Sequence, residues 1–415
     1  MKMLYRSLVG LQLLFWVGGY VAADEPLYKE EFIFDPQAAS HGHVHASSIV
    51  ECPNGDLRAV WYENGPALPI PPYYNERKDK SDDVRIGGSR KAAGSGAWET
   101  PFVMSDTFGV SDNNPAMVVD REGRLWLFHS TMLAAPEWSW GSSLLRYMIA
   151  TDYQQAGPPK WEKSELLFPR VVGFDNVLDQ AAKQLESLSA DNKSGFTKAR
   201  VDAYLGQLRK WTKDAPHLRL GWMPRAHPLV RADGALVVPL SNENFSIPAM
   251  AITSDAGATW TFSQPVPEIG LIQPTLVDFG DGTMDAYFRN SDQRRRIKRS
   301  TSTDGGVSWS KPELTDRLHP GGGLEVTRLK NGHLLLVYNN KERDPRDKLA
   351  VSISTDRGRT WSATRQLEDT PNARFDYPSV IQANDGTVHV SYSYNLQTIK
   401  HVQFNEEWVQ AGDGK

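Results

Sequence analysis

Apolar runs separated by glycine turns recur six times along the chain. In each copy an apolar run leads into a turn that ends in Gly, and a second apolar run follows. The turns are Asn54-Gly55, Glu122-Gly123, Asp233-Gly234, Asp281-Gly282, Asn331-Gly332 and Asp385-Gly386. The second runs are Leu57–Tyr62, Leu125–His129, Ala235–Leu240, Met284–Phe288, Leu334–Tyr338 and Val388–Tyr392. Asn-Gly and Asp-Gly between apolar runs are the strongest short-range signal of a β-hairpin, so the sequence predicts six hairpins.

A second pattern, Ser/Thr-x-Asp-x-Gly-x-Ser/Thr-Trp, occurs three times between the later hairpins, and we call it the Asp box. Its copies run from Thr253 to Trp260, from Ser302 to Trp309 and from Ser354 to Trp361. The Asp accepts hydrogen bonds from its own turn, the Gly supplies a positive φ, and the Trp packs back onto the unit. Copies about 50 residues apart indicate a repeat architecture. We therefore expect the boxes to hold the fold and to touch no substrate.

Six hairpins at this spacing predict an all-β fold, a six-bladed β-propeller with four strands per blade around a central channel. The last strand, Ile399–Phe404, is expected to pair with the first, Glu30–Phe34, which closes the ring and removes exposed sheet edges. Residues 174–213 break the repeat with helical periodicity. They predict a two-helix insertion that packs on a blade edge or covers one face. Residues 24–415 are expected to form one domain.

The ends and the composition of the chain limit the classes of function. Residues 1–23 have the charged, apolar and small-residue segments of a signal peptide, which predicts a secreted or periplasmic protein with no membrane span in its mature part. The net charge of −4 and the pI near 6.2 give no electrostatic basis for binding nucleic acid. Cys52 is the only cysteine, so no intrachain disulfide is expected.

Non-aliphatic residues occupy the start of each predicted inner strand, shortly before the turn Gly. They are His45, Asn114, His227, Gln273, Glu325 and Tyr377. In a propeller these positions converge at the mouth of the channel, where Arg225, Arg289 and Arg346 are also expected. Because a guanidinium binds an oxyanion through two hydrogen bonds, several arginines in one pocket suit a carboxylate or sulfate group.

Two further groups of residues could carry chemistry. A general acid should be a carboxylate on a partly shielded loop, and the candidates before the strand at Val84 are Asp79, Asp82 and Asp83. Alternating histidines share one face of a strand, and His41, His43 and His45 alternate. The sequence places no fourth ligand beside them, so no metal or other cofactor is expected.

Three Asp boxes on a six-hairpin repeat resemble the sialidase (neuraminidase) superfamily, in particular its bacterial neuraminidase-repeat branch. The resemblance implies a six-bladed propeller and a glycosidase whose nucleophile is a tyrosine. Tyr377 lies near the position of that nucleophile, and Arg289 and Arg346 match two arginines that bind the substrate carboxylate. Asp79 fits the catalytic acid by spacing, with Asp82 and Asp83 as close rivals.

Two positions depart from the family pattern. His45 stands where the first arginine of the family belongs, and Gln273 stands where the glutamate partner of the tyrosine belongs. Glu325 is expected to replace that partner, and the rest of the subsite is expected from His45, Asn114, Arg225, His227 and Gln273. The sequence thus predicts an exo-glycosidase that cleaves a terminal acidic sugar, sialic acid or a related uronic acid, from glycans. The alternatives are a polysaccharide lyase, with His45, His227 and Tyr377 as acid and base, and a non-catalytic carbohydrate-binding propeller.

Overall fold

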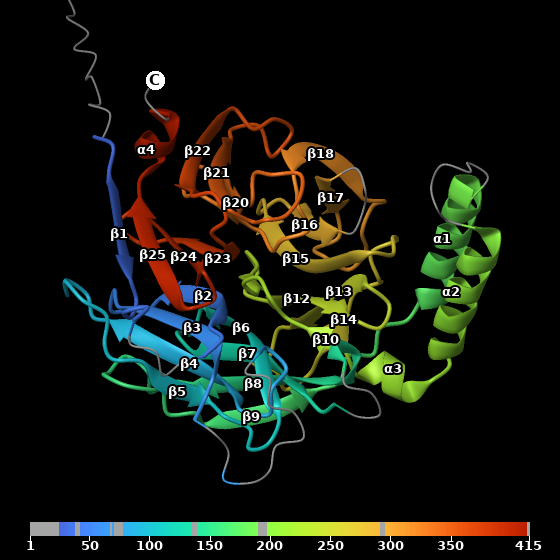
Figure 1. Cartoon of the computed structure of the whole chain (residues 1–415), viewed down its shortest axis with the longest axis horizontal. Coiled ribbons are helices and arrows are strands. Elements are labelled where there is room, and N and C mark those ends of the chain that lie inside the picture. Colours follow the sequence, from blue (N-terminus) through green and yellow to red (C-terminus); the bar gives the residue numbers. More distant parts are fainter. Residues whose placement is uncertain are drawn as a thin grey trace, which may run out of the picture.

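Six antiparallel sheets stand around a common axis like the blades of a propeller (Figure 1). The computed structural model describes residues 25–37, 42–66, 69, 78–134, 139–189, 197–290 and 295–412. Five sheets have four strands and the third has five, because its inner strand is broken in two. The predicted six-bladed β-propeller is confirmed, whereas the predicted signal peptide lies outside the described residues.

The first three blades follow one another along the chain. Blade 1 contains β2 (His45–Glu51), β3 (Leu57–Asn64), β4 (Val84–Lys91) and β5 (Phe102–Ser105). Blade 2 contains β6 (Ser111–Val119), β7 (Leu125–Met132), the 3-10 turn Trp140–Ser142, β8 (Ser143–Ala150) and β9 (Lys163–Leu167). Blade 3 contains β10 (Trp222–Met223), β11 (Leu229–Val230), β12 (Leu236–Asn242), β13 (Ile247–Thr253) and β14 (Thr261–Phe262).

The last three blades complete the ring, and every predicted glycine turn joins the inner strand of its blade to the strand that follows it. Blade 4 contains β15 (Leu271–Asp278), β16 (Met284–Asn290), β17 (Arg296–Ser302) and β18 (Glu313–Leu318). Blade 5 contains β19 (Glu325–Arg328), β20 (Leu334–Tyr338), β21 (Lys348–Ser354) and β22 (Ala363–Asp369). Blade 6 contains β23 (Phe375–Gln382), β24 (Val388–Tyr394), β25 (Thr398–Phe404) and β1 (Tyr28–Phe32), and α4 (Glu406–Gln410) follows it.

The N-terminal strand closes the ring by becoming the outer strand of the last blade. β1 pairs antiparallel with β25, from Tyr28 opposite Phe404 to Phe32 opposite Lys400 (Figure 1). The predicted pairing is confirmed, although the strand begins and ends two residues earlier than the predicted Glu30–Phe34. The first and the last described strands thus lie in one sheet, and β25 is paired on both sides.

The three Asp boxes join neighbouring blades. In each box the carboxylate accepts hydrogen bonds from the backbone and hydroxyl of the Ser or Thr four positions later, as Asp255 does from Thr259 at 2.9 and 2.6 Å. Trp260 of blade 3 packs on Tyr147 of blade 2, with ring centroids 5.5 Å apart. Trp361 of blade 5 lies 6.1 Å from Tyr287 of blade 4 in the same way. Trp260 and Trp361 therefore also pack on the preceding blade, which the repeat alone did not predict.

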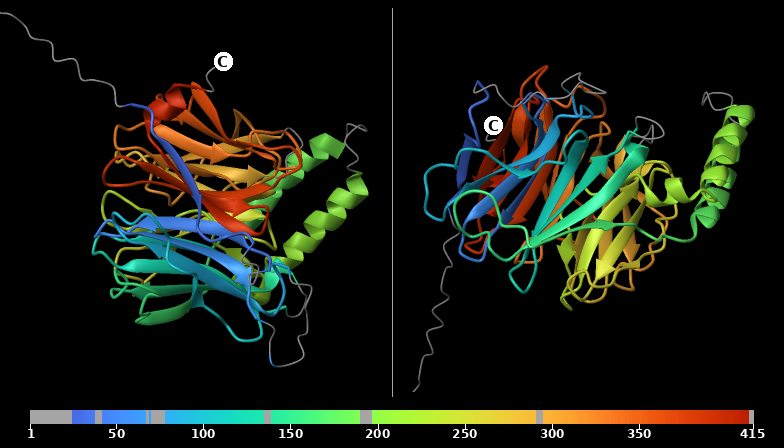
Figure 2. Two further views of the ribbon diagram at one scale, coloured as in Figure 1. Left: turned by 60° about the vertical axis from the view of Figure 1, so that its left-hand side comes forward. Right: turned by 90° about the horizontal axis from the view of Figure 1, so that it is seen from below.

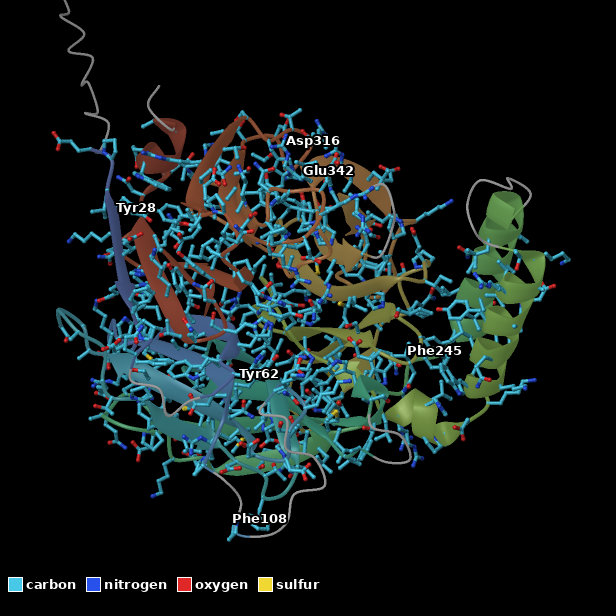
Figure 3. The ribbon with its side chains drawn as sticks, viewed as in Figure 1. Tyr28, Tyr62, Phe108, Phe245, Asp316 and Glu342 are labelled. Atoms are coloured by element: carbon cyan, nitrogen blue, oxygen red, sulfur yellow. The ribbon has the colours of Figure 1, made fainter. Side chains whose placement is uncertain are left out.

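The predicted two-helix insertion is confirmed and lies between β9 and β10. It consists of α1 (Phe174–Ser189) and α2 (Lys198–Trp211), followed by the short α3 (Ala215–Arg219). Phe174 stacks on Phe245 of blade 3, the residue labelled in Figure 3, at 4.7 Å between ring centroids. The two helices project from the rim of the ring (Figures 1 and 2). Of the two predicted placements, the structure shows packing on a blade edge. None of the described helices has the length and apolar character needed to cross a membrane.

Replacing Ser354 with Ala should lower the free energy of unfolding by about 1–3 kcal/mol. Ser354 is buried, and its hydroxyl accepts a 2.8 Å hydrogen bond from the Gly358 N–H, which the Ala variant leaves unsatisfied. Urea unfolding measures the change. The matched control is Thr355→Ala at the exposed neighbour, which should stay within about 0.5 kcal/mol of the parent. Equal losses of stability in the two variants would contradict the expectation that the box holds the fold.

Candidate active site

Four inner strands carry a β-bulge at the same level of the channel. The register shifts lie between His45 and Ser48 in β2 and at the corresponding places in β6, β15 and β23. The bulge residues have φ between 51° and 55°, and they are Ala46, Asn114, Gln273 and Tyr377. A positive φ is unfavourable for residues other than Gly, and bulges re-aim side chains. Ala46, rather than the predicted His45, is thus the counterpart of Tyr377 in blade 1.

The Tyr377 hydroxyl lies among groups from blade 4. Arg289 Nη1 donates to it at 2.9 Å, and Gln273 Nε2 lies 3.4 Å from it. Burial opposes ionisation of the phenol, but the positive charges of Arg289 and Arg346 and the hydrogen bond from Gln273 outweigh it. The pKa of Tyr377 is therefore below its usual value. The sequence correctly predicted that Tyr377, Gln273, Arg289 and Arg346 lie together. A phenol whose pKa is lowered by arginines can act as a nucleophile.

The ring of Tyr377 is held on several sides. The guanidinium carbon of Arg225 lies 4.7 Å from the ring centroid, and Arg225 is itself buried and donates to the carbonyl of Pro378 at 2.8 Å. His45 meets the ring edge-on at 4.5 Å between centroids. A Cβ at position 323 would lie only 2.3 Å from the ring, so the close approach requires Gly323. The hydroxyl is thereby fixed in place.

Glu325 does not pair with Tyr377, and that prediction is wrong. Its carboxylate accepts from the backbone N–H of His227 at 2.7 Å, from the His227 ring at 2.8 Å and from the Val380 N–H at 2.8 Å. The other ring nitrogen of His227 lies 2.6 Å from the carbonyl oxygen of Ile49. Both ring nitrogens therefore face acceptors. Burial disfavours the cationic form of the ring, but Glu325 raises the pKa of His227 above its usual value.

The inner strand of blade 3 is broken where it supplies two of these side chains. Pro224 and Pro228 have no N–H to donate to a sheet ladder. β10 and β11 each pair with β12, and the residues between them, Arg225 and His227 included, leave the ladder. A cavity of about 340 Å³ lies on the hairpin-turn side of the His227–Glu325 pair and is lined mainly by aliphatic side chains. His227 and Glu325 line this cavity, whereas Tyr377 does not.

Arg346 is held by a carboxylate that sequence reasoning missed. Its Nη1 donates to Asp376 Oδ1 at 2.7 Å and its Nη2 to the Gly321 carbonyl at 3.1 Å. Asp376 is fully buried, and Arg374 binds its other oxygen. Burial opposes ionisation, yet the positive groups around Asp376 lower its pKa to about 2. The sequence feature that could have revealed this carboxylate is an Asp immediately before the candidate nucleophile.

Asp79 is the candidate acid whose charge acts on Tyr62 and His43 near the site. Burial and the negative charge of Asp79 raise the pKa of Tyr62, which packs against His45 at 5.6 Å near the middle of the ring (Figure 3). The backbone carbonyl of Asp79 accepts from the Asn113 side chain at 2.6 Å. Asp83 is instead buried and accepts from Asn64 at 2.9 Å. Asp82 lies partly exposed in the turn before β4.

The other residues that the sequence predicted for the site and that the structure describes are buried. Asn114 is buried, with its amide nitrogen 3.9 Å from the sulfur of Met223. His45 bonds Ser393 Oγ through Nδ1 at 3.0 Å, and burial lowers the pKa of His45 well below its usual value. His41 lies outside the described residues. Within the described ranges, no group of three or more His, Cys, Asp or Glu side chains is placed to hold a metal ion.

Glu243, in the turn between β12 and β13, is a second group that the sequence did not reveal. Burial raises the pKa of Glu243 to about 7, although the positive charges of Arg289 and Lys80 oppose the shift. A carboxyl group close to Arg289 therefore changes charge near neutral pH. The sequence feature that could have revealed Glu243 is the polar run Asn242-Glu243-Asn244 at the end of an apolar strand.

Known proteins resemble this chain over most of its length. The family model described as BNR repeat-like domain matches residues 73–390, so the chain belongs to that family and to the sialidase superfamily. A sialidase from Micromonospora viridifaciens is 21% identical over 404 residues, which cover 93% of this chain but only 55% of that protein. Hadza microbial sialidase Hz136 superposes with a TM-score of 0.67 at 13% identity, covering 92% of this chain and 69% of its own. The Ruminococcus gnavus intramolecular trans-sialidase, in complex with oseltamivir carboxylate, gives 0.63 at 13% identity and covers 91% and 97%.

Tyr377 should be the first phenol to ionise when the folded protein is titrated with base. Its pKa is lowered, whereas burial raises the pKa of Tyr62 well above its usual value. The ultraviolet absorbance of tyrosinate follows the titration. Tyr377→Phe should remove the earliest phase, and Tyr62→Phe should leave that phase unchanged. An identical early phase in the parent and in Tyr377→Phe would show that the arginines do not act on this phenol.

Proposed function

We propose that the chain is an exported, sialidase-type glycosidase that removes a terminal acidic sugar, sialic acid or a related uronic acid, from glycans. The observation that carries the proposal is the 2.9 Å contact of Arg289 with the Tyr377 hydroxyl, beside a second guanidinium from Arg346. Arginines favour both a phenolate and the carboxylate of a bound sugar. While it is protonated, a phenol carries no charge that repels an anionic sugar, whereas an ionised carboxylate does. Residues 1–23 serve as the signal for export.

The reaction follows in two displacements. Tyr377 Oη, as the phenolate, forms a bond to the anomeric carbon while the bond to the leaving oxygen breaks, and Asp79 donates its proton to that oxygen. Water then attacks the anomeric carbon, the bond to Tyr377 breaks, and Asp79 takes the proton of the water. Gln273 has no basic group, so the arginines, rather than a carboxylate, favour loss of the phenol proton.

Replacing Tyr377 with Phe should lower the turnover rate at least about a thousandfold, which corresponds to about 4 kcal/mol of transition-state stabilisation. The measurement is release of the aryl group from aryl glycosides of sialic and uronic acids. Binding of the free acidic sugar should remain, because the arginines remain. Tyr204→Phe on the exposed face of α2 is the matched control. An unchanged rate in the Tyr377 variant would overturn the nucleophile assignment.

Activity on an acidic substrate should fall as the pH rises through about 7, the pKa of Glu243. Below this pH Glu243 is neutral; above it the carboxylate competes with the substrate for Arg289. The expected sign is therefore a rise in KM on the alkaline side with little change in kcat. Glu243→Gln cannot ionise and should flatten the KM profile. A variant profile that superimposes on the parent profile would exclude this effect.

The lyase and the binding-only alternatives have less support. Both ring nitrogens of His227 are already bonded, to Glu325 and to the Ile49 carbonyl, so this histidine is not an available base. A lyase would also leave a product with a new double bond that absorbs ultraviolet light. Turnover without such absorbance supports the hydrolase, and binding without turnover across the sugar panel supports the non-catalytic propeller.

A further inference from the structure

Arg225 is a buried cation that forms hydrogen bonds only to neutral groups. The residue is 2% exposed. Its Nη2 donates to the carbonyl oxygen of Pro378 at 2.8 Å, and its Nη1 donates to that of Ser47 at 3.3 Å. None of the described residues accepts a hydrogen bond from its Nε. Because burial of a charge is costly unless an opposite charge pairs with it, the position of this guanidinium needs an explanation.

The carboxylate whose charge acts most on Arg225 is bonded to other groups. The oxygens of Glu325 accept from the backbone N–H and the ring of His227 and from the N–H of Val380. Burial lowers the pKa of Arg225 below its usual value, although the negative charge of Glu325 opposes the shift. In the described part of the chain, no carboxylate thus forms a hydrogen-bonded pair with this guanidinium.

Two prolines direct Arg225 across the channel. Pro224 and Pro228 lack an N–H, and the residues between them do not join the ladder of β12. Arg225 therefore leaves the sheet of blade 3 and reaches carbonyl oxygens of blade 1 and blade 6. Its guanidinium carbon lies 4.7 Å from the centroid of the Tyr377 ring. The buried positive charge thus lies against the phenol that is the candidate nucleophile.

A second buried arginine shows what a purely structural guanidinium looks like in this fold. Arg58 is 1% exposed, and it also donates to two backbone carbonyls, those of Gly157 at 2.9 Å and Gln155 at 2.7 Å. Its guanidinium carbon lies 5.8 Å from the ring of Phe102, which cannot ionise. Burial against carbonyls is therefore not by itself a sign of function. What distinguishes Arg225 is that the ring beside it is a phenol.

We propose that Arg225 is a positioning residue of the candidate nucleophile, and that its buried charge favours the phenolate of Tyr377 where Gln273 supplies no base. When the phenol loses its proton to solvent, the buried cation gains an opposite charge beside it, so the cost of its burial falls as the phenolate forms. Arg225 is too buried to contact a ligand and acts on the reaction through Tyr377. The inference rests on the proposed function, since it takes Tyr377 as the nucleophile of that reaction.

The test changes Arg225 and leaves the other groups around the phenol in place. The other charged or titratable side chains that act on Tyr377 or pack against it are Arg289, Arg346, Asp376, His45 and Tyr62. Arg225→Met removes the positive charge and keeps an unbranched side chain. The ultraviolet absorbance of tyrosinate follows the titration phase that Tyr377→Phe removes.

In Arg225→Met this phase should move up by about one to two pH units. The kcat for an acidic aryl glycoside at neutral pH should fall about tenfold to a hundredfold, because each unit of pKa changes the phenolate fraction tenfold. The kcat should recover at alkaline pH as the phenol ionises, and KM should stay unchanged because Arg225 does not contact the ligand. Arg225→Lys restores a positive charge and should reverse most of the shift.

Arg58→Met is the matched control, because it also removes a buried guanidinium bonded to two carbonyls. This variant should lower the melting temperature and leave the phenol phase and the kcat profile like those of the parent. Arg225→Gln is a second neutral variant, whose amide can still bond a carbonyl if the Met variant does not fold. A folded neutral variant with a lowered melting temperature and the phenol phase of the parent would assign Arg225 a structural role and overturn the inference.

The outcomes also separate this inference from the proposed function, because the phenol titration needs no turnover. A parent protein that cleaves no acidic glycoside, but whose phenol phase shifts in Arg225→Met, would keep the action of Arg225 on Tyr377 and refute the hydrolase. A parent protein that cleaves acidic glycosides, with the phase and the kcat profile unchanged in the variant, would keep the hydrolase and refute the role of Arg225. A parent protein with neither an early phase nor turnover would refute both.

Discussion

The candidate site depends on the closure of the propeller ring. Tyr377 lies in the inner strand of blade 6, and it meets His45 of blade 1 and Arg225 of blade 3 across the channel. The contact with His45 exists only if blades 1 and 6 are neighbours. The pairing of β1 with β25 ties the N-terminal strand to blade 6, because the first described strand is the outer strand of the last sheet. Backbone hydrogen bonds at the rim thus hold together the side chains at the centre.

Two buried carboxylates organise the positive charge around the phenol. Asp376 binds Arg346 and Arg374, and Glu325 binds the ring of His227. Each carboxylate is buried, and each is stabilised as an anion because cations or N–H groups surround it. The positive charges of Arg289 and Arg346 and the hydrogen bond from Gln273 outweigh burial and the negative charge of Asp376, which accounts for the lowered pKa of Tyr377.

The difference between Tyr377 and Glu325 explains the main error in the sequence prediction. Both residues lie near the start of an inner strand, and both were expected at one level of the channel. β23 has a bulge with a positive φ at Tyr377, which turns the ring toward Arg289. β19 pairs with β20 from Glu325 onward without a register shift, and its carboxylate faces Val380 and His227 instead. A bulge of one residue changes the face that a side chain occupies, and counting from the turn Gly does not detect it.

The sequence by itself determined the repeat, the six hairpins, the Asp boxes, the closing strand and the helical insertion. These features follow from local turn chemistry and from periodicity, which are encoded within short segments. It also identified Tyr377, Gln273, Arg289 and Arg346 as one group. Only the tertiary structure decided that Glu325 serves His227, that Asp376 joins Arg346 to Arg374, and that burial shifts Glu243 to a pKa of about 7. Burial and ion pairing depend on side chains from separate blades, and no local pattern contains their distances.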